Sequence, residues 1–340
     1  MSFEGAAMVL AAGRGVRMRP LTDARAKPTL PVLGMSLLER IVRFLAAEGI
    51  RAVAVNAHHA AASVRACLDR CSDLPVQREL FVEPELMGSG GAFVAPRSLL
   101  ACSESFLVHN GDTLVRAPVE ELAHAAQRPD TLGALLVRPG RVPGYRPVLV
   151  RDGRVVGLSG DAAAQVGEPA TYLGVAVFRR AVLDAVPPDR PSELFGDVLL
   201  PLVARGMRLA AVPYRGPWLE FTSPPDYRRK LVRLVLESRE RGSADLPGGP
   251  APCRPVPEGC CFFGEGAVAA DSRLAGGVVL ERGARVIGSS VSDSVLLEQA
   301  QVGPGSRLER AVVAAGSRVS PGTVVRDTVH GSEPAREKDR

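Results

Sequence analysis

A repeat near the end of the 340-residue chain constrains the fold more than any other feature. VLLEQAQVGPGSRL (295–308) aligns with VVAAGSRVSPGTVV (312–325) at an offset of 17 residues, and VLERGARV (279–286) matches VLLEQAQV (295–302) at an offset of 16. An aliphatic residue recurs every six residues in three runs: Val268, Leu274, Leu280 and Val286; Leu296, Val302 and Leu308; and Val313, Val319 and Val325. This period predicts a left-handed parallel β-helix of hexapeptide repeats, with one short strand on each of three sides.

The first part of the chain follows a different pattern, in which short apolar runs alternate with amphipathic stretches. The runs predict strands at 6–11, 51–56, 81–83, 105–112, 131–137, 146–153 and 171–178, and the stretches predict helices at 36–49, 59–70 and 225–239. Ser36 and Glu39 form a candidate capping box at the start of the first helix, and Gly49 a candidate end. This alternation predicts an α/β domain with a Rossmann-like, mostly parallel sheet between layers of helices.

The composition changes near residue 240, where RERGSADLPGGPAPCRPVPEG carries proline and glycine at the density of a linker. We therefore expect an α/β domain over residues 1–240, a linker over 241–257 and the β-helix over 258–328. The remaining residues, 329–340, are predicted to form a charged tail without fixed structure.

The stretch from Leu10 to Gly34, LAAGRGVRMRPLTDARAKPTLPVLG, combines glycines with positive charge and is called the signature segment below. The dinucleotide-binding fingerprint Gly-x-Gly-x-x-Gly requires a third glycine, which would fall at position 18, and the chain has Met18 there. The segment also lacks the Gly-Lys-Ser/Thr of a Walker A loop. An ordinary tight turn after a strand is one interpretation. However, glycines let backbone N–H groups approach phosphate oxygens, and guanidinium groups bind such oxygens in pairs. Four arginines and one lysine, among them Arg14, Arg17, Arg19 and Lys27, share the segment with a single carboxylate, Asp23, which favours a polyphosphate ligand.

The signature segment resembles that of the sugar-1-phosphate nucleotidylyltransferases, L-A-x-G-x-G-T-R-[ML]-x-P-L-T followed by K-P and P-V, with Val16 in place of threonine. Three later stretches are similar to family motifs in the same order: EPELMGSGGA (83–92), HNGD (109–112) and WLEFTSPPDY (218–227). The β-helix is similar to that of the mannose-1-phosphate guanylyltransferase and glucose-1-phosphate adenylyltransferase branches.

The resemblance implies a GT-A-like nucleotidyltransferase domain and an enzyme that transfers a nucleotidyl group from a nucleoside triphosphate to a sugar 1-phosphate, releasing pyrophosphate. Arg17 and Lys27 are the implied catalytic residues, and Asp112 and Glu220 the implied ligands of Mg²⁺. The implied nucleotide-binding residues are Leu10, Ala11, Ala12, Gly13, Gly15, Arg17, Lys27, Gly88, Ser89, Gly90 and Gly91. The implied sugar-binding residues are Asn110, Gly174 and Glu168.

Two positions depart from the family pattern. Glu220 stands where the family has aspartate, and Glu168 is followed by Pro169 where many members have lysine. Sugar recognition therefore cannot be carried over with the rest. The β-helix and the VNAHH stretch (55–59) favour mannose 1-phosphate with GTP. The alternatives are a UTP- or dTTP-dependent enzyme acting on glucose 1-phosphate or MurNAc 1-phosphate, and a catalytically silent regulatory homologue that binds nucleotide sugars.

Composition argues against several other classes of protein. Aromatic residues make up only 4% of the chain, too few for the stacking surfaces of single-stranded nucleic-acid binders. No apolar run is long enough for a membrane helix, and the N-terminal residues lack the basic start of a signal peptide. The six cysteines include no Cys-x-x-Cys pair, which predicts reduced thiols and a cytoplasmic protein. Nucleic-acid and membrane partners are not expected, and the β-helix is expected to join copies of the chain into a homo-oligomer.

Overall fold

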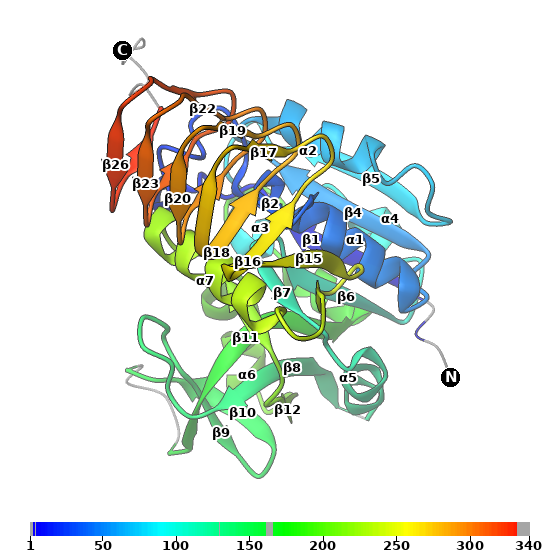
Figure 1. Ribbon diagram of the computed structural model, residues 1–340. Coiled ribbons are helices and arrows are strands. Elements are labelled where there is room, and N and C mark those ends of the chain that lie inside the picture. Colours follow the sequence, from blue (N-terminus) through cyan, green and yellow to red (C-terminus); the bar gives the residue numbers. More distant parts are fainter. Residues whose placement is uncertain (1–2, 4, 129, 161–165, 332–340) are drawn as a thin grey trace. The chain divides into compact units, whose positions relative to one another are not determined.

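The computed structural model describes residue 3 and residues 5–128, 130–160 and 166–331 (Figure 1). Its contacts divide the chain into two compact units. The sheet unit contains the residues up to Gly13 together with Ile41–Trp218, and the coil unit contains Arg14–Arg40 together with the residues from Leu219 onward. Within the described residues, no helix is both long and apolar enough to cross a membrane.

The sheet unit is built on nine strands in the order β5-β4-β1-β6-β11-β8-β12-β10-β9 (Figure 1). Their bounds are Ala6–Leu10 (β1), Ala52–Ala57 (β4), Gln77–Val82 (β5), Ser105–Asn110 (β6), Thr131–Pro139 (β8), Val148–Arg151 (β9), Arg154–Leu158 (β10), Glu168–Arg179 (β11) and Arg208–Pro213 (β12). Phe106 is fully buried in the core of this unit, and its ring centroid lies 5.6 Å from that of Phe93 and 6.1 Å from that of Phe178.

The sheet is mixed, so the prediction of a mostly parallel sheet holds for one part of it. Strands β5, β4, β1 and β6 pair in parallel, as do β8 and β12. Strand β11 is antiparallel to β6 and β8, and β10 is antiparallel to β12 and β9. The turn between β9 and β10 has positive φ at Asp152 (50°) and Gly153 (70°), the geometry of a tight hairpin, and a hairpin makes its two strands antiparallel.

The helices are α1 (Leu37–Ala47), α2 (Ala61–Asp69), α3 (Gly88–Gly91), α4 (Arg97–Leu100), α5 (Val119–Ala126), α6 (Leu200–Ala204) and α7 (Pro224–Glu237). The caps predicted for the first helix are confirmed in α1. At the start of α1, the Ser36 N–H donates to Glu39 Oε2 (2.9 Å) and the Glu39 N–H donates to Ser36 Oγ (3.1 Å), a reciprocal capping box. After its end, Gly49 takes a φ of 87° that closes the helix.

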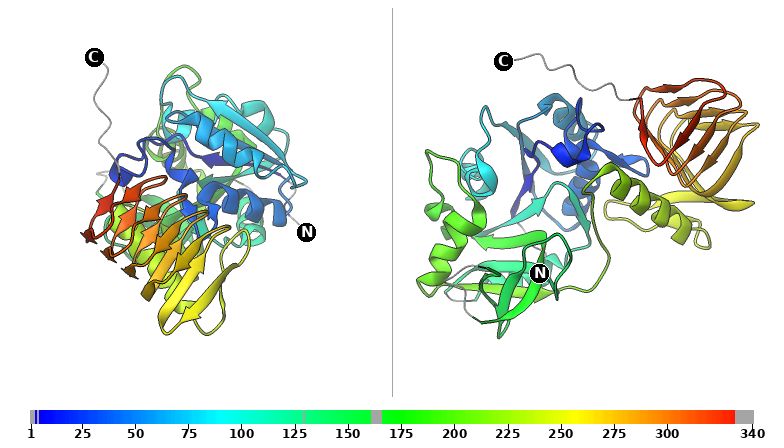
Figure 2. Two further views of the ribbon diagram at one scale, coloured as in Figure 1. Left: turned by 45° about the horizontal axis from the view of Figure 1, so that its top comes forward. Right: turned by 90° about the vertical axis from the view of Figure 1, so that its left-hand side faces the viewer.

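The coil unit contains the β-helix, whose strands lie side by side in successive coils (Figures 1 and 2). The strands are β16 (Glu258–Phe263), β17 (Val268–Ala270), β18 (Arg273–Leu280), β19 (Arg285–Ile287), β20 (Ser290–Ser292), β21 (Val295–Leu296), β22 (Gln301–Val302), β23 (Arg307–Glu309), β24 (Val312–Val313), β25 (Arg318–Val319), β26 (Val324–Arg326) and β27 (Val329–His330). From β16 onward the coils pair in parallel, as the repeat predicts.

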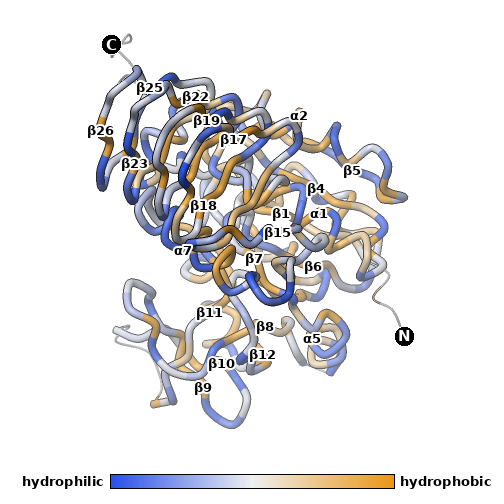
Figure 3. The backbone as a smooth tube through the Cα atoms, in the orientation of Figure 1, coloured by the Kyte–Doolittle hydropathy of each residue, from blue (hydrophilic) through white to orange (hydrophobic). Residues whose placement is uncertain are grey.

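Aliphatic ladders fill the interior of the β-helix. Leu280 pairs with Leu296 and then Val313; Val286 pairs with Val302 and then Val319; Leu274, Val291, Leu308 and Val325 form the third ladder. In Figure 3 hydrophobic and hydrophilic segments alternate along these coils. The prediction that Val268 points inward is wrong. Its side chain is 36% exposed and pairs with Arg285, whereas Ala269 pairs with Val286 and takes the inward place.

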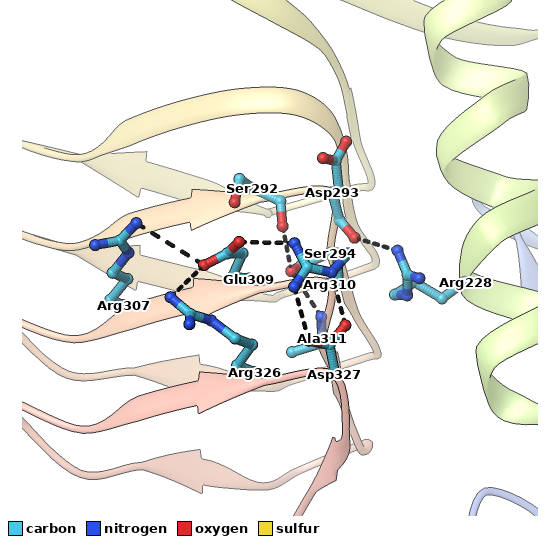
Figure 4. Close-up of polar contacts among 10 residues, drawn as sticks. All are labelled: Arg228, Ser292, Asp293, Ser294, Arg307, Glu309, Arg310, Ala311, Arg326 and Asp327. Atoms are coloured by element: carbon cyan, nitrogen blue, oxygen red, sulfur yellow. Dashed lines mark hydrogen bonds and ion pairs between the residues drawn. The ribbon is translucent and has the colours of Figure 1, made fainter.

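Polar stacks hold the corners of the coils together. The Ser289 N–H donates to Ser272 Oγ and the Ser306 N–H donates to Ser289 Oγ, both at 3.2 Å. Figure 4 shows a charged corner, where Arg310 donates to Asp327 (2.6 Å) and to the preceding residue, Glu309 (2.7 Å). The two serine bonds and the Arg310–Asp327 bond join residues 17 positions apart, on successive coils, so they stabilise the stacking of the coils.

Two short strands lie in the region predicted as a linker. Strand β14 spans Ser243–Ala244, and β15 spans Ala251–Val256 and pairs antiparallel with β16. Helix α7 packs on β16 and β18. Positions 332–340 of the predicted tail lie outside the described residues. The domain boundaries drawn from the sequence stay predictions.

Candidate active site

From Arg14 onward the signature segment belongs to the coil unit and folds back on itself, so that Gly15 lies against Lys27. Gly15 has a φ of 62° and precedes a short 3-10 helix, Val16–Met18; a second one spans Lys27–Thr29. The Thr22 hydroxyl donates to the Gly15 carbonyl (2.9 Å). A Cβ added at Gly15 would lie 3.2 Å from Thr22 Cγ2 and 3.3 Å from Lys27 Cβ, tight contacts that add to the strain of a side chain at this φ.

The cations of the signature segment differ in burial. Lys27 is only 8% exposed, whereas Arg14, Arg17 and Arg19 are exposed. Arg19 forms an ion pair with Asp23, with Nε and Oδ1 3.3 Å apart. A lysine with a buried stem presents its charge from a fixed place, and an exposed arginine can follow a ligand.

In the sheet unit, the end of β1 is fixed by a buried polar pair that the sequence analysis did not assign. The Ala11 N–H donates to Asn56 Oδ1 (2.7 Å), and Asn56 Nδ2 donates to Glu83 Oε1 (2.7 Å). The other oxygen of Glu83 accepts the Met87 N–H (3.1 Å), next to the glycine-rich α3. Asn56 and Glu83 therefore connect two of the predicted nucleotide-binding stretches. Their sequence signal was a polar residue ending an otherwise apolar strand and a carboxylate directly after the next one.

The glycines of α3 lie close to the backbone around Ser192. The N–H groups of Gly90 and Gly91 both donate to the Ser192 carbonyl (2.8 and 3.2 Å). A Cβ added at Gly88 would lie 2.5 Å from the same oxygen, and the φ of Gly88 is 74°. Ser89 Oγ donates to Glu193 (2.6 Å). Packing inside the sheet unit therefore accounts for the glycines at 88 and 90–91, whose role toward nucleotide stays a prediction.

The carboxyl ends of β1 and β6 bring several predicted site residues together. Leu10 pairs with Asn110, and the Gly111 N–H donates to the Leu10 carbonyl (2.9 Å). The half-buried Asp112 follows in the same turn. Gly174, with φ of 79°, approaches Asn110 so closely that a Cβ there would lie 2.9 Å from Asn110 Nδ2. Ligands commonly collect at this edge of an α/β sheet.

Glu168 lies elsewhere in the sheet unit. It is exposed at the first position of β11 and pairs with Val150. It lies six positions before Gly174 along the strand, which corresponds to roughly 20 Å. The structure thus brings together Asn110 and Gly174 of the predicted sugar-binding residues, and it does not bring Glu168 to them.

His109 lies in β6, where it pairs with Val9 of β1 and Val175 of β11, and burial determines whether its side chain is charged. Burial lowers the pKa of the imidazole to about 4, although the Asn110 carbonyl and Asp112 favour the proton. The His109 Nδ1 lies 2.8 Å from the Asn110 carbonyl oxygen. A neutral His109 therefore supports the turn that carries Asp112 without adding a charge to it.

Glu220 lies at the end of β13 (Trp218–Glu220) and is half-buried. Lys230 on α7 donates from Nζ to the Glu220 carbonyl and to Asp226 Oδ2 (2.8 Å for the latter), and the Thr222 N–H also donates to Asp226 (3.1 Å). These bonds fix the backbone at Glu220 to the first turns of α7. Among the described residues, no group of three or more His, Cys, Asp or Glu side chains is arranged to hold a metal ion.

Comparisons with known proteins agree on one family. A family model described as nucleotidyl transferase matches residues 6–146, and one described as GlmU-like C-terminal hexapeptide matches residues 260–337. The mannose-1-phosphate guanylyltransferase of Mycobacterium tuberculosis is 30% identical over 307 residues, covering 87% of this chain and 80% of the relative. The UTP–glucose-1-phosphate uridylyltransferase of a Synechocystis species is 25% identical over 257 residues, covering 71% of this chain and 66% of the relative.

A solved structure shows the same fold. The crystal structure of HddC from Yersinia pseudotuberculosis superposes with a TM-score of 0.57 at 18% sequence identity, covering 67% of this chain and 99% of that one. Enzymes of the nucleotidyl transferase family generally use a divalent metal ion. The chain belongs to the nucleotidyl transferase family and is a sugar-1-phosphate nucleotidylyltransferase with a C-terminal hexapeptide β-helix.

Proposed function

We propose that this enzyme transfers a guanylyl group from GTP to mannose 1-phosphate, forming GDP-mannose and pyrophosphate. The name of the Mycobacterium tuberculosis relative and its match along both parts of the chain support this pair of substrates. A phosphate oxygen of the sugar 1-phosphate attacks the α-phosphorus of the triphosphate, and pyrophosphate leaves on the opposite side. Such a reaction needs positioning and charge stabilisation more than covalent help from the protein.

The packing of Gly15 against Lys27 is the observation that carries this proposal. It supports a turn whose backbone holds the triphosphate beside a lysine with a buried stem. In the proposed mechanism, Lys27 attracts both the α-phosphate and the attacking sugar phosphate and so holds the two reactants together. The exposed Arg17 stabilises the charge that develops on the departing pyrophosphate.

The carboxylates of Asp112 and Glu220 have the right chemistry for the family's metal ion. Mg²⁺ is commonly held by one or two carboxylates together with phosphate oxygens of the substrate. We propose that these two residues hold Mg²⁺, which when bound supplies positive charge that neutralises the phosphates. The bonds from Lys230 and Thr222 around Asp226 leave Glu220 a fixed backbone from which its longer side chain can extend.

A second candidate pair of substrates is UTP with glucose 1-phosphate, which the name of the Synechocystis relative favours. The proposed sugar contacts centre on Asn110 and Gly174, which lie together at the sheet edge. Glu168 is a separate proposal, since it lies at the far end of β11.

Pyrophosphate release measured for four nucleoside triphosphates against a panel of sugar 1-phosphates tests the proposal. With Mg²⁺ present, the highest kcat/KM is expected for GTP with mannose 1-phosphate, and chelation of the metal should stop the reaction. A maximum for UTP with glucose 1-phosphate would replace the proposed substrates by the second pair. No release with any pair, together with measurable binding of GDP-mannose, would contradict the catalytic proposal in favour of a silent homologue.

We further propose a cytoplasmic homo-oligomer. The six cysteines, all in the described part of the chain, are free thiols, which fits a reducing compartment. Among the described strands, β25, β26 and β27 of the last coil each pair with a strand on one side only, so that this end of the β-helix offers backbone groups to a second copy.

A further inference from the structure

The part of the signature segment that carries Lys27 is bonded to the β-helix on both sides of that lysine. Before Lys27 in sequence, Arg25 Nη1 donates to both oxygens of Glu298, at 3.0 and 3.2 Å. After it, the Gly34 N–H donates to Glu281 Oε2 at 3.0 Å. All of these residues belong to the coil unit. The ten residues from Arg25 to Gly34, called the lysine segment below, are thus fixed at each end by a glutamate of the β-helix.

The Arg25–Glu298 pair is shielded enough to hold its geometry. The two side chains are 23% and 20% exposed, and a single guanidinium nitrogen is shared by both carboxylate oxygens. Exposed ion pairs contribute little because water and salt screen them, whereas a partly buried pair is screened less. Between Arg25 and Lys27 the chain has only one residue. Displacement of Arg25 would therefore move Lys27 with it.

The other end of the lysine segment is a strained turn held by two buried side chains, those of Arg40 and Glu281. Leu33 has a positive φ of 52° and Gly34 one of 88°, in the two-residue hairpin between β2 (Pro31–Val32) and β3 (Met35–Ser36). A leucine in this conformation costs roughly 1–2 kcal/mol. The Leu33 carbonyl accepts from Arg40 Nη2 (2.8 Å) while the next N–H, that of Gly34, donates to Glu281. Both polar atoms of one peptide bond are therefore fixed.

Further contacts show that this arrangement is part of a larger buried network. Arg40, which is 0% exposed, also donates to the carbonyls of Val32 and Gly249, both at 2.8 Å. The Tyr227 hydroxyl on α7 donates to the Pro31 carbonyl. Glu281 is 1% exposed, and its Oε1 has no hydrogen-bond partner among the described residues. Burying polar or charged side chains costs free energy unless they form hydrogen bonds or ion pairs. The hydrogen bonds of these side chains to the backbone hold the lysine segment in one conformation.

We propose that Glu298 and Glu281 are positioning residues for Lys27, so that the hexapeptide β-helix takes part in catalysis by holding the lysine segment in place. The inference rests on the proposed role of Lys27 in the transfer reaction. It gives the β-helix a function within each single chain, separate from any part it plays in assembly. A reactive group displaced by about 1 Å can lose about 100-fold in rate, so small movements of this segment matter.

The variant Glu298→Gln tests the proposal, because it removes the negative charge that binds Arg25 and nearly keeps the size of the side chain. The matched control is Asp327→Asn, which removes the charge of an ion pair with Arg310 on the same β-helix (Figure 4). Two quantities are measured for each variant: kcat and KM for both substrates, and hydrogen–deuterium exchange of the backbone amides in residues 25–34. Thr29 and Leu30 are useful reporters, since their N–H groups donate to Ala26 and Lys27 carbonyls.

For Glu298→Gln we expect kcat to fall by about 10- to 100-fold with little change in the KM for nucleotide, and exchange in the lysine segment to rise. Asp327→Asn should leave both unchanged. The exchanged pair Arg25→Glu with Glu298→Arg should recover part of the lost kcat, which a general loss of folding would not allow. Wild-type kcat or wild-type exchange in Glu298→Gln would overturn the proposal.

The same data separate this proposal from the proposed function. If the wild-type protein released no pyrophosphate with any substrate pair, the proposed function would fail, and exchange in residues 25–34 alone would decide whether Glu298 holds the segment. If the wild type were active and Lys27→Met inactive while Glu298→Gln behaved as wild type, only the positioning role would fail.

Discussion

The two glycines of the Gly13-x-Gly15 turn have different physical reasons to be glycine. Gly15 adopts a left-handed conformation and contacts Thr22 and Lys27, so the fold itself requires it. Gly13 does not have a positive φ, and a Cβ added there would meet nothing within 4 Å. The protein alone therefore gives no reason for glycine at position 13, and the close approach of a ligand to the backbone would give one.

This difference predicts opposite effects of two alanine substitutions. Gly15→Ala should lower the free energy of unfolding by about 1–2 kcal/mol, because alanine is strained at this φ. Gly13→Ala should leave that free energy unchanged but raise the KM for the nucleoside triphosphate about 10-fold or more, since its methyl group would occupy the path of the phosphates. Urea unfolding and steady-state kinetics measure the two effects. A Gly13→Ala enzyme with wild-type KM would argue against triphosphate binding at this turn.

At the scale of elements, the sequence predicted those features that depend on interactions between residues close together in the chain. The capping box of α1 and the aliphatic ladders of the β-helix follow from residues a few positions apart, and both are confirmed. Strands β10 and β12 and helix α5 are short and were not predicted, although Val119, Leu122, Ala123 and Ala126 of α5 are buried at helical spacing. Val268 fits the six-residue period in sequence, but the first coil shifts its register by one residue.

The contacts that shape the candidate site depend on distant parts of the chain. Asn56 and Ala11 are 45 residues apart, and Arg25 and Glu298 are 273 apart. No local period or turn signal reports such pairs. The motifs of the family resemblance indicated which residues matter for the reaction, but they did not indicate that the β-helix contacts the signature segment.

The buried carboxyl group of Glu281, which binds the β2–β3 hairpin, leads to a prediction about how the stability of the protein depends on pH. Burial and the neighbouring Glu298 raise the pKa of its carboxyl to about 8, against the opposing effects of the Gly34 N–H and Arg40. The folded protein therefore keeps this proton up to about pH 8, whereas the unfolded chain releases it near the ordinary value of 4.5. Stability from this group is greatest below pH 4.5 and is lost as the pH rises toward 8.

Between pH 5.5 and 7.5 the free energy of unfolding of the wild type should therefore fall with pH more steeply than that of Glu281→Gln, by at most about 1.4 kcal/mol per pH unit. Urea unfolding at several pH values measures both slopes. Glu309→Gln is the matched control, because a hydrogen bond from Arg310 lowers the pKa of Glu309 and moves its titration out of this range. Equal slopes in wild type and Glu281→Gln would show that Glu281 is ionised in the folded protein.

At the scale of the whole molecule, the chain passes between the two units three times, after Gly13, Arg40 and Trp218. Helix α1 is continuous across the second of these crossings, and its capping box, Ser36 with Glu39, belongs to the coil unit. The β-helix is therefore not an appendage joined by a single linker. Its unit includes the signature segment from Arg14 onward, which is far from the β-helix in sequence.

Chains of several domains commonly unfold in separate steps, but here we expect one transition, because loss of the coil unit would remove the first turn of α1 and the signature segment after β1. Buried cysteines report on each unit: Cys67, 1% exposed, in the sheet unit and Cys261, 0% exposed, in the coil unit. Pulsed alkylation across a urea gradient, read by mass spectrometry, should give coincident midpoints for the two thiols. Midpoints that differ clearly would mean that the units unfold independently, and the β-helix could then be removed without loss of the sheet unit.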